Sequence, residues 1–130
     1  GRTVRPATAG DLGACDRLCL AVHGHDRSPQ VRDAIAAGTA SVVEYDGRIS
    51  GYSAGLSFFA HSVGETVDDL RALIGAAEAF GGPGILVPAR NAALFTWCLA
   101  AGLRVVQTMT LMSIGPYQEP AGAWLPAIMY

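Results

Sequence analysis

The sequence predicts an α/β domain whose elements follow the order β-α-α-β-β-β-α-β-α-β-β over residues 1–130. Three observations predict this class. Apolar residues near the N-terminus recur at three- and four-residue steps, which is typical of helices with one buried face. A strong hairpin signal, Asp46-Gly47 between two strand-like stretches, follows these helices. Neither a repeat nor a linker interrupts the chain, which indicates one domain.

The first elements are a short strand, Thr3 to Ala7, and a helix that begins after Thr8. Asp11 stands three residues after Thr8, the spacing of a capping box. Gly24 is expected to end the helix. The apolar stripe of this helix consists of Leu12, Cys15, Leu18, Cys19 and Val22.

A second helix is expected to start at Ser28-Pro29, with Ser28 as N-cap, and to end at Gly38. The stretch 41–52 then carries the hairpin, with Asp46-Gly47 as a two-residue turn. Extended structure is expected to continue from there to about Val63.

The remaining elements alternate between helix and strand. Thr66 and Asp69 predict the capped start of a third helix. A glycine-rich turn leads into an expected buried strand, Ile85 to Pro88, and Asn91 can cap a helix that runs to Ala101. Two strands, over residues 103–114 and 125–130, are expected to complete the sheet.

Composition and charge exclude several classes of protein. Nine Arg against eleven acidic residues give a net charge of −2, too balanced for electrostatic capture of nucleic acid. The longest uncharged stretch, 49–64, is too polar to span a membrane. Three cysteines without a repeated spacing favour a reduced, cytoplasmic protein. Because the chain starts with Gly and enters a strand at once, we expect it to be a piece of a longer chain.

Charged residues are nearly missing from the C-terminal part of the sequence. Between residues 79 and 130 they are Arg90, Arg104 and Glu119. This pattern predicts either central strands covered on both faces or an apolar surface that another chain or domain covers. The second alternative implies a homodimer or packing against a second domain.

Two motifs in this order resemble the GNAT (GCN5-related N-acetyltransferase) superfamily. The stretch 42–52 resembles its central hairpin, and the helix from Asn91 to the Gly102-Leu103 end resembles its late motif. The resemblance covers essentially the whole chain. It implies a mixed, mostly antiparallel central sheet with helices on both faces. It also implies acyl transfer from acetyl-CoA to a small-molecule amine or N-terminal acceptor.

The resemblance also places the acyl donor. In GNAT enzymes acyl-CoA lies between two parallel strands that splay apart, here the strand ending near Val63 and the strand 85–87. Val63, Gly64 and Asn91 would then contact the cofactor. The loop that would hold the pyrophosphate, 61–69, has one Gly, no Arg and three carboxylates, so it is a degenerate version of the family's loop.

The resemblance places two residues at positions that are catalytic in GNAT enzymes. Glu65 stands where some GNAT enzymes carry a general base, although it could equally serve the N-terminus of its helix. Cys98 aligns with a tyrosine that acts as general acid toward the departing thiolate. A thiol can donate a proton, but a free Cys among apolar neighbours is also typical of plain core packing.

Histidines supply the remaining candidates. His23 and His25 lie in the connection between the first two helices, which in GNAT folds shapes the acceptor pocket. With His61 they could contact the substrate. Metal binding by this His-x-His is a weaker alternative, since zinc sites need more ligands, and a solvated or capping loop is the third.

Two functional versions therefore compete. In the first, the domain transfers an acyl group itself. In the second, it is the non-catalytic half of a tandem GNAT protein and serves as an acceptor-binding or dimerisation domain. An unrelated ligand-binding or regulatory domain is a third class, because a fold does not fix a function.

Overall fold

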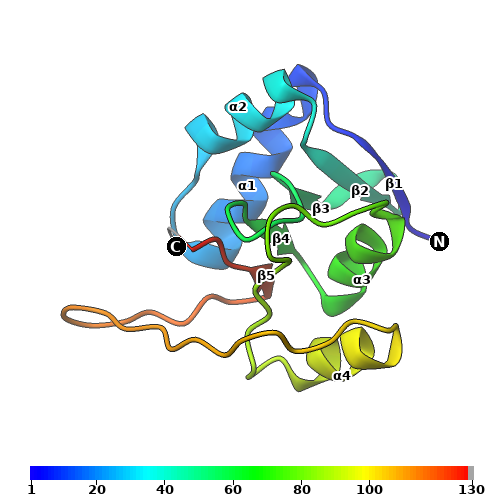
Figure 1. The fold of residues 1–130 in the computed structure, drawn as a ribbon. Helices are drawn as coiled ribbons and strands as arrows, with labels where there is room; N and C mark the ends of the chain where they lie inside the picture. The colour runs from blue at the N-terminus through cyan, green and yellow to red at the C-terminus, as the bar shows by residue number, and fades with distance from the viewer. Residues whose placement is uncertain (129–130) are drawn as a thin grey trace.

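The computed structural model describes residues 1–128. The elements expected at the N-terminus, a strand followed by two helices, are present (Figure 1). The sheet and its helices follow the chain in a simple order. The elements are β1 (Thr3–Pro6), a 3-10 turn (Ala9–Asp11), α1 (Leu12–His23), α2 (Ser28–Ala37), β2 (Ser41–Tyr45), β3 (Arg48–Ser53), β4 (Ser62–Gly64), α3 (Val67–Ala76), α4 (Ala92–Ala100) and β5 (Ala123–Leu125).

All five strands form one sheet in sequence order, and every neighbouring pair is antiparallel. The β2–β3 connection is the predicted two-residue turn. Asp46 has φ of 55° and Gly47 has φ of 76°, and positive φ at both central positions defines the turn type that joins tightly twisted strands. The capping boxes predicted at Thr8 and Thr66 are also present.

Helices cover both faces of the sheet, and each face has its own core (Figure 1). Alternate residues of the strands supply the two sides, so neighbouring Val42 and Val43 face opposite cores. The face toward α1 and α2 buries Cys15, Leu18, Cys19, Val22, Val31, Val42, Tyr52 and Val63. The face toward α3 and α4 buries Val43, Leu70, Leu73, Ile74, Leu94, Cys98, Ala123 and Leu125.

The C-terminal part differs from the sequence prediction. Residues 85–88 and 103–114 contain no strand, although both stretches are rich in strand-forming residues. The reason is pairing: the free edge of β4 is taken by Ala123–Leu125, which forms the last strand in place of the expected 125–130. Met129 and Tyr130, the end of that expected strand, lie outside the described residues. The start of α2 is also shifted by one residue, because Arg27 and not Ser28 is its N-cap.

Residues 103–119, named here the apolar arm, leave the body of the protein after α4 and return to it at β5 (Figure 1). Several large apolar side chains of the arm are solvent-exposed, with Met112 at 86% and Ile114 fully accessible. Of the two explanations for the uncharged C-terminal part, central strands covered on both faces is therefore wrong for the arm. Val106, Met112 and Ile114 of the arm are the most exposed, at 70% or more.

Close contact between α3 and the sheet depends on two glycines. Gly51 and Gly64 are paired across β3 and β4, and the side chain of Asp69 lies against both. A Cβ atom added to Gly64 would stand 2.8 Å from the Asp69 Cβ and 3.0 Å from the Thr66 carbonyl oxygen. Both distances are below ordinary contact, so these positions require the absence of a side chain.

We predict that Gly64→Ala destabilises the protein by about 1–3 kcal/mol, since the new methyl group forces α3 away from the sheet. Gly75→Ala is the matched control. Gly75 is exposed in α3, has nothing within 4 Å of an added Cβ, and should tolerate alanine or gain about 0.5–1 kcal/mol. Urea unfolding of both variants measures the difference, and equal stability of the two would contradict this packing.

Candidate functional site

Two hollows open on the α1–α2 side of the structure. The first, named the α2 pocket, has a volume of about 250 Å³ and lies between α2 and the loop that joins β3 to β4. The second, named the α1 groove, has a volume of about 520 Å³ and runs between α1 and the ends of β3 and β4. Together they contain two of the predicted site residues, His61 and Glu65.

His61 forms the floor of the α2 pocket. Its side chain is 3% exposed, and its Nε2 shares a hydrogen bond of 2.9 Å with the Tyr52 hydroxyl, which comes from β3. Burial lowers the pKa of His61 to about 3, and burial raises the pKa of Tyr52, with the Cys19 thiol as a further hydrogen-bonding partner. At neutral pH His61 is therefore an uncharged hydrogen-bonding group and a poor proton acceptor.

The other two histidines lie at the end of α1. The rings of His23 and His25 are 5.9 Å apart, and the His23 ring also contacts Trp124 of β5 edge to face. Burial lowers the pKa of His23 to about 4. Among the described residues no three His, Cys, Asp or Glu side chains gather as metal ligands. His23 and His25 are not among the residues that line either hollow.

Glu65 lines the α1 groove, where it pairs with Arg48 across the end of the sheet. Arg17 of α1 also lines this groove. Cys98 lies elsewhere. It is 5% exposed in the core between α3 and α4, where burial raises its thiol pKa. The sheet separates the two groups, so the structure does not bring the expected acid and base together.

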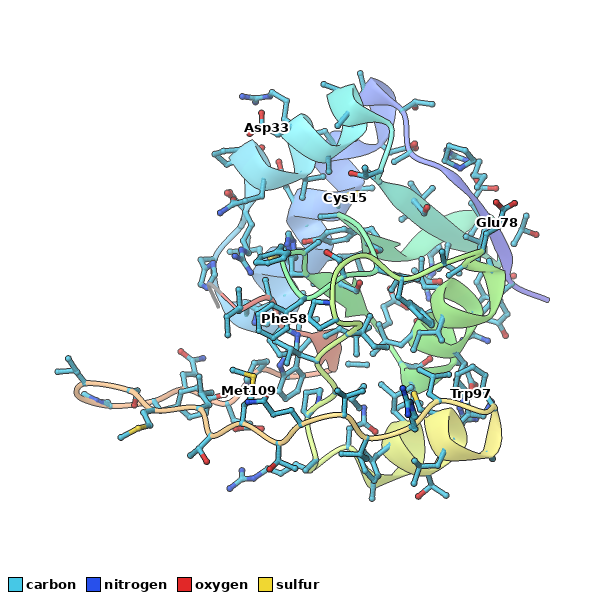
Figure 2. All side chains as sticks on the ribbon, viewed as in Figure 1. Cys15, Asp33, Phe58, Glu78, Trp97 and Met109 are labelled. Carbon is cyan, nitrogen blue, oxygen red and sulfur yellow. The ribbon has the colours of Figure 1, made fainter. Side chains whose placement is uncertain are left out.

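The residues expected to contact acyl-CoA have structural partners. Val63 is fully buried under α1, and Gly64 is packed beneath Asp69. Asn91 caps α4, with its Oδ1 accepting a hydrogen bond of 3.2 Å from the backbone N–H of Leu94. Figure 2 shows the side chains of the described residues on the ribbon, including Cys15 on α1 and Met109 on the apolar arm.

The expected opening beside β4 is also filled. All three β4 residues pair with β3 on one side and, antiparallel, with β5 on the other, through Ser62–Leu125, Val63–Trp124 and Gly64–Ala123. The prediction of a parallel neighbour at 85–87 is therefore wrong. A strand with ladders on both edges leaves no slot for a pantetheine chain between it and its neighbour.

Around the start of α3, backbone N–H groups that could bind a diphosphate donate hydrogen bonds within the chain itself. The backbone N–H of Glu65 donates to the Ser50 carbonyl oxygen at 3.0 Å, and the N–H of Thr66 donates to Asp69 Oδ2 at 2.9 Å. The N–H of Asp69 donates to the Thr66 carbonyl oxygen at 3.2 Å. Diphosphate sites at helix starts use free N–H groups of this kind. Three of the N–H groups around this helix start are therefore already bonded within the chain, which disfavours a diphosphate here.

The acidic residues of that loop are less repulsive than the sequence suggests. Although no Arg lies between Arg48 and Arg71 in the chain, arginines reach the loop from other elements. Arg48 pairs with Glu65, Arg71 with Asp68, and Arg2 with Asp69 at 2.9 Å. The obstacle to a diphosphate is thus the engaged N–H groups more than uncompensated charge.

Sequence reasoning missed the charged lining of the α2 pocket. Arg27, Gln30 and Asp33 project into it from α2, where the sequence shows ordinary polar positions on a helix surface. Ala54, Phe59 and Ala60 complete the lining from the β3–β4 connection. The sequence pattern does not distinguish such residues from other polar residues on a helix surface, because the pocket forms only when the β3–β4 connection packs next to α2.

Comparisons with known proteins support the fold. No protein-family model matches the chain, and no curated protein is significantly similar to it in sequence. A crystal structure of a GNAT-family acetyltransferase from Bacillus cereus superposes with a TM-score of 0.68 and 17% sequence identity, over 96% of this chain and 95% of that one. The chain therefore has the GNAT fold, as the motifs predicted. No helix in residues 1–128 is long and apolar enough to cross a membrane.

The buried state of His61 predicts a pH dependence of stability. The unfolded chain takes up a proton near pH 6.5, whereas folded His61 stays neutral down to about pH 3. The unfolded state thus binds more protons between these values, and stability falls as the pH is lowered through this window. From pH 8 to pH 5 the loss from His61 is about 2 kcal/mol.

His61→Gln keeps a hydrogen-bonding group for Tyr52 and removes the titration. Urea unfolding at pH 8 and pH 5 should show a loss smaller by about 2 kcal/mol in this variant than in the unmodified protein. An identical loss in His61→Gln would show that His61 is not the group responsible.

Proposed function

We propose that this chain is a GNAT-type acyltransferase domain that holds the amine acceptor and does not bind the acyl donor itself. The α2 pocket is the acceptor site, and acyl-CoA binds to a second GNAT domain. One observation carries the proposal. The loop before α3, which would hold the pyrophosphate, has the N–H groups of Glu65, Thr66 and Asp69 engaged with its own chain.

Two further observations support it. β4 is paired on both edges, and Cys98 is buried on the face of the sheet opposite Glu65. A general acid must reach the departing thiolate, which a buried thiol behind the sheet does not. The α2 pocket, by contrast, is open and lined with polar groups, and it lies beside the connection that shapes the acceptor pocket in GNAT folds.

A catalytic domain is the second candidate. The match to a GNAT-family acetyltransferase over nearly the whole of both chains favours it, as does the position of Glu65 in the open α1 groove. In this version Glu65 would act as the base. Arg48, which holds Glu65 in an ion pair, would have to release it.

Calorimetric titration with acetyl-CoA separates the two candidates. We expect a dissociation constant in the millimolar range or no binding, because a diphosphate would have to displace the internal hydrogen bonds of the loop. Coenzyme A without the acetyl group should behave alike, since it carries the same diphosphate. A dissociation constant at or below about 10 μM for either ligand would restore the catalytic candidate.

The apolar arm is the proposed contact with the second GNAT domain, supplied either by a tandem half or by another copy of this chain. Val106, Met112 and Ile114 are 70% or more exposed on it, and Arg104 and Glu119 are its charged residues. Apolar surface of this extent on one segment is typical of interfaces.

If another copy of this chain supplies the contact, sedimentation of the unmodified chain shows association that increases with concentration. The double variant Met112→Ser/Ile114→Ser should weaken it at least about tenfold, because each large apolar side chain contributes about 1.5–3 kcal/mol when buried. Leu20→Ser is the control, an exposed apolar residue of α1 outside the arm, at 55% exposure. A monomer at high concentration would rule out self-association and leave the tandem arrangement.

A further inference from the structure

The α2 pocket contains one cation and one anion that do not pair with each other. Arg27 and Asp33 both line it, and within the described residues neither side chain has an ion-pair partner within 4.0 Å or a side-chain hydrogen bond. Elsewhere Arg2, Arg5, Arg48 and Arg71 all pair with carboxylates. In the α1 groove, by contrast, the acid that lines the hollow, Glu65, is paired with Arg48.

The two residues stand apart along the axis of α2. Arg27 is the N-cap of α2 and Asp33 stands six residues further on, which corresponds to about 9 Å along the helix axis. Figure 2 shows Asp33 on α2. A ligand seated between these positions can meet a guanidinium at one end and a carboxylate at the other.

The remaining lining is neutral and largely apolar. Ala34, Ala54, Phe59 and Ala60 offer apolar surface, and Phe59 is 69% exposed. Gln30 adds an amide, and His61 stays uncharged at neutral pH because burial lowers its pKa to about 3. The pocket thus presents one positive group, one negative group and an apolar wall.

We propose that the α2 pocket binds a small zwitterion of the amino acid type, with its carboxylate on Arg27 and its ammonium group on Asp33. An apolar side chain of the ligand lies against Phe59. This inference rests on the proposed function, because it names the class of amine that the acceptor site takes.

The charges discriminate against other ligands. A simple amine would leave the Arg27 guanidinium without a partner, and a simple anion would meet the Asp33 carboxylate. Ligands that leave a charged group of the site unpaired bind more weakly than those that satisfy it. A volume of about 250 Å³ also lies just below the usual range of ligand pockets, which favours a compact molecule over a nucleotide.

Binding of three related probes to the full chain tests the proposal. The probes are L-leucine, leucinamide, which lacks the carboxylate, and N-acetyl-L-leucine, which lacks the ammonium group. Chemical-shift titration suits the weak affinities expected of so small a ligand. L-leucine should bind at least about tenfold more tightly than either blocked form, the usual effect of losing one charged hydrogen bond.

Two variants assign the ends of the ligand. Arg27→Gln should remove the preference for L-leucine over leucinamide, and Asp33→Asn should remove the preference over N-acetyl-L-leucine. Arg32→Gln is the matched control, since Arg32 is exposed on α2 and does not line the pocket. It should leave all three affinities unchanged.

Three outcomes would overturn the proposal: equal affinities for the three probes, no binding of L-leucine, or preferences that survive in Arg27→Gln and Asp33→Asn. Binding of leucinamide without a preference for L-leucine would overturn the zwitterion and leave the amine acceptor site standing. Tight binding of acetyl-CoA would overturn the proposed function instead, and the probe affinities do not depend on that titration.

Discussion

The rest of the structure depends on the buried carboxylate of Asp69, which links α3 to β3 and to the N-terminal segment. It is fully buried and accepts hydrogen bonds from the Ser50 hydroxyl at 2.6 Å, from Arg2 Nε at 2.9 Å and from the backbone N–H of Thr66 at 2.9 Å. These donors come from β3, from the start of the chain and from the start of α3. A buried charge needs such complete partnership, because an unpaired one costs several kcal/mol.

The same carboxylate affects the chemistry available to the domain. A helix start attracts anions, and in a nucleotide-binding protein the bound phosphate takes that position. Here the anion at the start of α3 belongs to the chain itself, above the Gly51–Gly64 pair that makes room for it. The interaction that holds α3 against the sheet thus also places a carboxylate of the chain at this helix start, which is the basis of our proposal that the domain does not bind the acyl donor.

The sheet divides the molecule into two sides that differ in their surface. On the side of α3 and α4 the core consists of apolar residues, and Cys98 packs within it. On the side of α1 and α2 both hollows open, and the hydrogen bond between Tyr52 and His61 runs beneath one of them. β5 closes the sheet edge next to β4, and the apolar arm that leads to it stays uncovered. Both hollows therefore lie on one face of the sheet, and the exposed apolar side chains lie on the arm.

The sequence by itself determined the local features: the Asp46-Gly47 turn, the capping boxes at Thr8 and Thr66, and the helix stripes, because each depends on residues a few positions apart. The GNAT fold followed from their order. Only the tertiary structure decided which segment pairs with β4. The sequence predicted strands over 85–88, 103–114 and 125–130, but the pairing depends on a distant edge, which Ala123–Leu125 takes. The tertiary structure also decided that Arg2 and Arg48 neutralise the acidic loop and that Arg27 and Asp33 share a pocket, because side chains far apart in sequence meet only after folding.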